Sequence, residues 1–160
     1  MTHTKEDIVS LLSEIPDPEI PVISISELGI LRSVEVEGEK VIVTITPTYS
    51  GCPAMRAIED EIKVVLHQHG VENIEVKLVY SPVWTTDWMN EEAKEKLRKY
   101  GISPPGKRSL KNLISGDRQA ACPRCGSTDV KLVSLFGSTA CKALYTCNAC
   151  REPFDQFKCH

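Results

Sequence analysis

Two closely spaced cysteine pairs are the residues of this chain best suited to chemistry. Cys122 and Cys125 form one Cys-x-x-Cys pair, and Cys147 and Cys150 form another, with 21 residues between the pairs. A two-residue spacer brings both sulfur atoms of a pair to one turn, and two such turns complete a tetrahedron of four thiolates around zinc. The spacing predicts a zinc ribbon with structural zinc; a rubredoxin-type iron site uses the same ligands and is the less favoured alternative. Because four cysteines close the coordination sphere, we expect no catalysis at this centre.

Three further residues of the tail, Cys141, Cys159 and His160, also carry metal-ligating side chains. They are candidates for a second, labile metal site, to which Cys52 would add a ligand. In the competing interpretation, Cys141 packs inside the ribbon and the terminal residues are loose. We favour the interpretation without a second metal site.

Cys52 is the one cysteine outside the tail, and it stands directly before Pro53 at the predicted start of a helix. Backbone N–H groups and the helix dipole favour an anion there, which predicts a lowered thiol pKa. Such a thiolate is suited to hold iron or an iron–sulfur cluster transiently, or to accept sulfur. A small buried cap residue is equally consistent with the sequence. No histidine or asparagine adjoins Cys52, and no phosphate loop, dinucleotide fingerprint or hydrolase elbow is present, so we expect a non-enzyme.

An acidic, proline-rich loop precedes the first predicted strand. Its carboxylates Asp17, Glu19 and Glu27 offer the hard oxygen ligands that iron accepts. Such side chains more often cap turns and helices, and we favour capping here.

Two tryptophans, Trp84 and Trp88, follow the third predicted strand. Tryptophan is enriched at interaction hot spots, so the pair is a candidate docking surface for a partner. The plainer interpretation is that these rings cover the predicted sheet, and the two interpretations are compatible.

The apolar pattern of residues 1–102 predicts the elements that position these side chains. Thr4 and Asp7 form a capping box before a helix with one apolar face, and a turn at 37–39 joins two alternating strands. A second helix follows Cys52, and a third strand and a charged helix complete the series. The order is α-β-β-α-β-α, a small α+β sandwich domain, followed by a ribbon with strands within 130–136 and 142–146.

Charge and cysteine content divide the chain. Residues 1–102 carry 10 Lys/Arg against 18 Asp/Glu, whereas residues 103–160 carry 9 against 4. We place an α+β domain at 1–102, a linker at 103–120 and the ribbon at 121–160. The acidic first domain and the negative charge of a four-thiolate zinc centre argue against nucleic-acid binding. Without a long apolar run or a signal core, the sequence predicts a cytoplasmic protein with no membrane association; homodimerisation is left open.

Three segments resemble the iron–sulfur assembly domain family: DPEIPVISISELGILRSVEV, TPTYSGCPAM and VYSPVWTTDWMNEEAKEKLRKYGI. With the cysteine-rich tail added, the whole chain resembles the PaaD (PaaJ) family, small proteins encoded with the bacterial phenylacetyl-CoA epoxidase system of aerobic phenylacetate degradation. The resemblance places the family cysteine at Cys52 and the family's acidic loop at Asp17 and Glu19. It implies a component of a multicomponent monooxygenase, with a di-iron oxygenase and a reductase carrying flavin and an iron–sulfur cluster as partners.

These observations favour a non-catalytic accessory or maturation factor that assists assembly of an iron or iron–sulfur centre. The runner-up is an adaptor that bridges components without metal transfer. Nucleic-acid binding by the ribbon is the third and weakest of these non-enzymatic functions.

Overall fold

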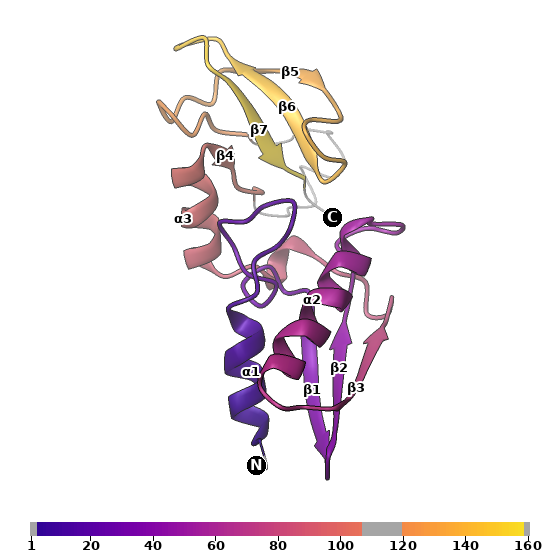
Figure 1. The fold of residues 1–160 in the computed structure, drawn as a ribbon. Helices are drawn as coiled ribbons and strands as arrows, with labels where there is room; N and C mark the ends of the chain where they lie inside the picture. The colour runs from indigo at the N-terminus through magenta and orange to yellow at the C-terminus, as the bar shows by residue number, and fades with distance from the viewer. Residues whose placement is uncertain (1–2, 107–119, 159–160) are drawn as a thin grey trace. The chain divides into compact units, whose positions relative to one another are not determined.

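The computed structural model describes residues 3–106 and 120–158 (Figure 1). The chain divides into two compact units, Met1–Trp84 and Thr85–His160, and each unit has its own β-sheet. None of the helices in the described ranges combines the length and apolar character that a bilayer crossing requires.

The sheet of the first unit has three strands in the order β1-β2-β3. Strand β1 (Leu31–Glu37) is antiparallel to β2 (Lys40–Ile45), and β3 (Asn73–Leu78) is parallel to β2. Helix α2 (Ala54–Gln68) connects β2 to β3, the crossover that a parallel pair requires. The loop that carries Cys52 therefore lies between the carboxyl end of β2 and the start of α2.

Apolar side chains of helices and strands form the interior of this unit. Strand β2 is buried along most of its length because it lies between two other strands. Helix α2 buries one apolar face: Ala54, Met55, Ile58, Ile62 and Leu66. The spacing of these residues, three or four apart, is what directs them to one side of the helix.

Helix α1 (Lys5–Ser13) also packs on this unit and buries Ile8 and Leu12. Its capping box is present: the N–H of Asp7 donates to Thr4 Oγ1 at 3.2 Å, and the N–H of Thr4 donates to Asp7 Oδ2 at 2.9 Å. These two bonds satisfy N–H groups that have no partner inside the helix, which fixes where α1 begins.

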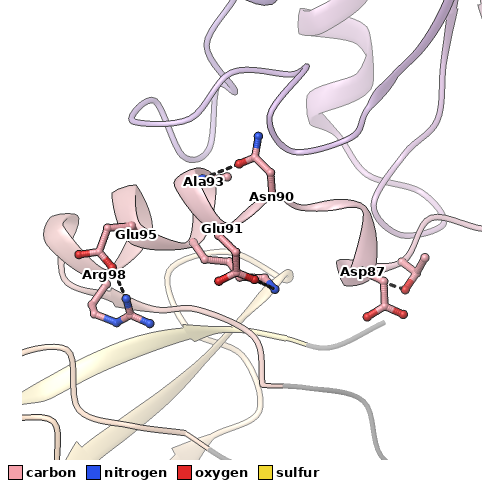
Figure 2. A network of polar contacts seen from close by, with 8 residues as sticks. Asp87, Asn90, Glu91, Ala93, Glu95 and Arg98 are labelled. Carbon is pink, nitrogen blue, oxygen red and sulfur yellow. Dashed lines mark hydrogen bonds and ion pairs between the residues drawn. The ribbon is translucent and has the colours of Figure 1, made fainter.

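The second unit opens with a short 3₁₀ turn, η1 (Thr86–Trp88), and helix α3 (Glu91–Tyr100). Figure 2 shows Asn90 at the start of α3, where its Oδ1 accepts the N–H of Ala93 at 2.7 Å. Farther along the exposed face of the helix, Arg98 forms an ion pair with Glu95. Capping and pairs three residues apart support a helix that buries little apolar surface.

A four-stranded sheet follows α3, in the order β4-β7-β6-β5. Strand β6 (Lys142–Cys147) is antiparallel to both β5 (Val130–Ser134) and β7 (Pro153–Phe157). The two-residue strand β4 (Ile102–Ser103) pairs parallel to β7. The ribbon is thus a three-stranded meander with one short added strand from the chain that precedes it.

The predicted α+β fold class is confirmed, including the α-β-β-α-β-α order and the tail hairpin. Strand β4 was not predicted, because two residues are too few to show a periodic pattern. In the structure, α3 and β4 belong to the second unit. The domain limits 1–102, 103–120 and 121–160 remain predictions.

Candidate functional site

The cysteines of the two Cys-x-x-Cys pairs meet at one point of the second unit. Their four Sγ atoms all lie within 4.8 Å of one another. The Sγ of Cys122 is 3.7 Å from that of Cys150, and the Sγ of Cys125 is 3.6 Å from that of Cys147. Four thiolates at about 2.3 Å from a central zinc ion stand about 3.8 Å apart. The spacing of the sulfur atoms therefore fits a tetrahedral four-thiolate metal centre.

Two similar turns bring these sulfur atoms together. The N–H of Gly126 donates to the carbonyl of Cys122 at 2.9 Å, and the N–H of Arg151 donates to the carbonyl of Cys147 at 3.0 Å. Both turn residues have a positive φ, 76° at Gly126 and 65° at Arg151. Glycine adopts this conformation at little cost, whereas an L side chain is strained there. The second turn therefore repeats the geometry of the first at a conformational cost.

Hydrogen bonds and neighbouring groups affect protonation of the sulfur atoms. The N–H of Cys150 donates to the Sγ of Cys147 at 3.5 Å and lowers the pKa of the Cys147 thiol to about 7. The N–H of Glu152 also acts to lower the pKa of Cys150, but burial and the neighbouring thiols outweigh it and raise that pKa to about 12. Because four sulfur atoms at this separation lose all their protons only when a cation balances their charge, the cluster favours a divalent metal ion.

A small apolar core lies beside the cluster. It contains six buried residues: Ala120, Cys122, Ala143, Tyr145, Cys147 and Phe154. The rings of Tyr145 and Phe154, on neighbouring strands, stack with centroids 5.8 Å apart. A core of this size contributes limited hydrophobic stabilisation, so a bound metal ion would supply much of the folding free energy of the ribbon.

Cys141 lies directly before β6, outside the four-cysteine cluster. Its side chain is buried, and its Sγ is 2.9 Å from the Oγ1 of Thr139. Within residues 3–106 and 120–158, the four-cysteine cluster is the one group of three or more metal-ligating side chains that lie close together. Cys159 and His160 lie outside the described residues, so a second metal site that includes them remains a prediction.

Cys52 is half-buried in the loop before α2, and its surroundings differ from those expected. Burial raises the pKa of the Cys52 thiol above its ordinary value. The N–H of Ala54 lowers this pKa, as the helix start should, but Glu19 and Asp17 act against it through their negative charges. The predicted lowering of the Cys52 pKa is therefore wrong, because burial and carboxylates from a distant loop outweigh the helix N-terminus.

An open hollow of about 520 Å³ adjoins Cys52. Most of its lining is apolar, and Arg56 and Glu59 of α2 are its two charged residues. The complete lining is Ile45, Cys52, Pro53, Met55, Arg56, Glu59 and Leu78. No motif in the sequence marks Arg56, although it follows Cys52 by four residues and so lies about one helical turn farther on. The Cys52 thiol is thus accessible from a space that also presents a guanidinium group.

Two carboxylates of the acidic loop cap turns, which is the interpretation favoured from the sequence. Asp17 is buried, and its Oδ1 accepts the N–H groups of Glu19 at 2.9 Å and Ile20 at 2.8 Å. Glu27 Oε2 accepts the N–H of Ser24 at 2.9 Å, so this carboxylate also caps a turn. Asp17 and Glu19 are nevertheless close enough to Cys52 to affect its pKa. The fold therefore brings the acidic loop to the thiol, and the role of Asp17 and Glu19 as metal ligands remains a prediction.

Trp84 does not contribute to an exposed surface. Its side chain is 1% exposed, and its Nε1–H donates to the carbonyl of Leu28 at 2.9 Å. The predicted docking role of Trp84 is therefore wrong, since the ring covers the interior of the first unit, as the alternative interpretation held. Trp88 is half-buried, and its docking role remains a prediction.

Comparison with protein-family models divides the chain in the same way as its cysteine content. Residues 5–78 match the iron–sulfur cluster assembly protein family, and residues 106–158 match the PaaD zinc beta ribbon domain. A solved structure of a DUF59 domain of unknown function from Bacillus anthracis is 30% identical and has a TM-score of 0.55, over 58% of this chain and 90% of that chain.

Two relatives extend this result. An Fe-S protein maturation auxiliary factor of Porphyromonas gingivalis is 38% identical over 57% of this chain and 88% of its own length. A protein of Escherichia coli, provisionally named as one of the subunits of 1,2-phenylacetyl-CoA epoxidase, is 50% identical over 96% of this chain and 92% of its own length. The chain therefore belongs to the PaaD family of the phenylacetyl-CoA epoxidase system, in which an iron–sulfur assembly domain precedes a PaaD zinc ribbon.

Proposed function

We propose that this chain is a non-catalytic maturation factor that supplies or protects an iron or iron–sulfur centre of a phenylacetyl-CoA epoxidase system. The observation that carries the proposal is the half-buried Cys52 thiol beside an open hollow, with Asp17 and Glu19 near it, in an iron–sulfur assembly domain. The attached ribbon is of the PaaD type, which links this assembly domain to the epoxidase family.

In this proposal, Cys52 is a transient ligand for iron or for an iron–sulfur cluster. A single sulfur ligand beside a hollow leaves most coordination positions open to the cargo and to a receiving protein. Thiolate is a favoured ligand of iron–sulfur clusters, and the nearby carboxylates are hard ligands suited to iron. Few protein ligands mean weak retention, which suits delivery better than storage.

The second part of the proposal assigns structural zinc to the ribbon, with Cys122, Cys125, Cys147 and Cys150 as the ligands. The Sγ separations of 3.6 and 3.7 Å support this assignment, since they match a tetrahedron of thiolates around zinc. Zinc has no redox chemistry of its own, and four thiolates leave it no open position. The ribbon therefore holds its metal permanently and takes no part in metal transfer.

The proposed partners are the oxygenase and reductase components of the epoxidase system. Support comes from the name of the Escherichia coli relative, which describes one of the subunits of that system, and from relatives named as Fe-S maturation auxiliary factors. Neither a dimer nor a nucleic-acid complex is part of the proposal.

The test measures iron and acid-labile sulfide in the two components, purified from cells that contain the wild-type chain, no chain, or the Cys52→Ser variant. We expect full occupancy with the wild type and deficient components in the other two cases. The matched control is Ser50→Ala, an exposed change two residues before Cys52 in the same loop, which should behave as the wild type.

Full occupancy in the absence of the chain would refute the maturation role. Deficiency without the chain, combined with full occupancy with Cys52→Ser, would instead identify an adaptor that acts without sulfur ligation.

A further inference from the structure

Strand β5 is the outer strand of the ribbon sheet, and large apolar side chains on and after it are exposed. Leu132 is 41% exposed, Val133 56%, Leu135 48% and Phe136 66%. Strand β6, on its inner side, is buried along most of its length. We call the four apolar residues, together with Lys131, the β5 patch.

The geometry of a strand explains why the sheet itself does not cover this patch. Strand β5 has a neighbouring strand on one side only, and Val133 lies at a register shift between Leu132 and Ser134, where the regular alternation of side chains is interrupted. Leu132 and Val133 are both exposed, and the residue of β5 that packs against the ribbon core is Val130. A group of exposed apolar side chains at a sheet edge marks an interaction surface or an aggregation hazard.

Positive charge borders the patch. Lys131 is exposed and forms no ion pair within the described residues, and the Nζ of Lys158 lies 4.2 Å from the centre of the Phe136 ring. Two other cations of the ribbon lie beside carboxylates: Arg124 pairs with Glu152 at 2.6 Å, and Lys142 lies 3.8 Å from Asp155. The rim of the β5 patch therefore presents cations to whatever covers it.

Charge and register indicate whether the β5 patch binds a second copy of the chain or a different protein. Two copies that met through their β5 patches would place lysine against lysine, and like charges oppose association. The register of β5 and β6 also shifts between Leu132 and Ser134, and such irregularities turn an edge away from backbone pairing with another strand. Both features discourage self-association and leave the apolar side chains available to an acidic partner.

We propose that the β5 patch docks an apolar surface rimmed by Asp and Glu on a component of the epoxidase system, the oxygenase or the reductase. This rests on the proposed function for the identity of the partner system, but not on metal transfer by Cys52. Apolar side chains supply most of the affinity, and the lysines select an acidic rim and favour fast association.

The test uses the full-length, zinc-loaded chain and each purified component, with affinity measured by titration calorimetry at low and high salt. We expect one component to bind, and the double variant Val133→Lys/Phe136→Lys to weaken binding about tenfold or more, as loss of central apolar contacts does. Lys131→Glu should weaken binding by a smaller factor, and that loss should shrink at high salt.

The matched control is Val64→Lys, which changes an apolar residue of α2 that is 47% exposed and should leave affinity unchanged. Zinc content and thermal melting of each variant show whether the ribbon stays folded. Wild-type affinity in the double variant, failure of the wild type to bind either component, or a wild-type dimer that the double variant abolishes would each overturn the proposal. Cys52→Ser should bind normally while failing to support iron loading, so the docking and maturation proposals fail separately.

Discussion

The two sulfur-bearing regions of this chain place cysteine in opposite surroundings. In the ribbon, four Sγ atoms lie within 4.8 Å of one another, and backbone N–H groups donate to them. In the first unit, the Cys52 thiol is half-buried beside an open hollow, and burial, together with the charges of Glu19 and Asp17, raises its pKa despite the N–H group of Ala54. Since the number of ligands sets how firmly a metal ion is held, the ribbon suits permanent binding and Cys52 suits brief contact. Cysteine sulfur thus holds a structural metal ion in the ribbon and, in our proposal, transfers iron or a cluster in the first unit.

Removal of the metal ion should produce the largest difference between the two regions, because only the ribbon should unfold. We expect strong chelation of the zinc-loaded chain to unfold the ribbon, because metal binding contributes about 10 kcal/mol or more to the folding of four-ligand zinc modules of this size. The first unit has its own apolar interior and should stay folded. Amide NMR spectra check this: signals of β5–β7 should collapse, whereas those of α1, α2 and β1–β3 should keep their dispersion.

The control for this prediction is Cys125→Ser, which removes one ligand and should produce the same partial unfolding without chelator. A ribbon that keeps its spectrum after complete metal removal would contradict the proposed structural role of zinc.

The two turns of the ribbon give a second, smaller test, since one holds Gly126 and the other Arg151 in the same backbone conformation. Arg151→Gly should stabilise the ribbon by about 1 kcal/mol, because it removes the strain of an L side chain at positive φ. Gly126→Ala should destabilise it by a similar amount. An added Cβ at Gly126 meets no atom within 4 Å, so conformation and not collision sets the cost.

Chemical denaturation of the zinc-loaded variants measures both changes. If Arg151→Gly lowered stability, the Arg151 side chain would have to make a stabilising contact that exceeds its strain.

The smallest effect concerns the protonation of Cys52. The rate of thiol alkylation rises as pH passes the thiol pKa, so burial and the nearby carboxylates should place this rise at higher pH than for free cysteine. Glu19→Gln removes one negative charge and should move the rise to lower pH. It should not restore the value of free cysteine, because burial is the largest cause of the shift and is unchanged.

Iodoacetamide labelling of the metal-free chain across pH, followed by peptide mass spectrometry, reports Cys52 separately from the ribbon thiols. Glu72→Gln, an exposed carboxylate that is not among the causes of the Cys52 shift, serves as the control and should leave the profile of the wild type unchanged. An upward shift with Glu19→Gln would contradict the electrostatic account.

Local patterns in the sequence were enough to predict the three α-helices, strands β1–β3, the β5–β6 hairpin and the cysteine cluster, but not the two-residue strand β4. The apolar spacing of α2 and the two-residue gaps of the Cys-x-x-Cys pairs each describe geometry within a few residues, and the fold keeps that geometry. The direction of the Cys52 pKa shift could not be predicted in this way. It depends on burial and on Glu19, which is 33 positions away in the sequence and is brought near by the fold.

The predicted docking role of Trp84 was wrong for a similar reason, because burial of the ring depends on contacts that only the fold creates. A tryptophan suits an interface and an interior equally well, and only the fold places its indole against the carbonyl of Leu28. The Cys52 hollow likewise combines residues of β2, α2 and β3, which no local pattern connects.

The pairing of β4 with β7 bears on how nature or an engineer can exchange this ribbon between proteins. Ser103 Oγ accepts the N–H of Ala121 at 3.4 Å, and helix α3 contacts β4, so the ribbon is bonded to chain that precedes its first cysteine pair. A gene fusion that began just before Cys122 would leave the outer backbone of β7 without its parallel neighbour. A transplantable cassette should instead begin near Thr85, where the second compact unit starts.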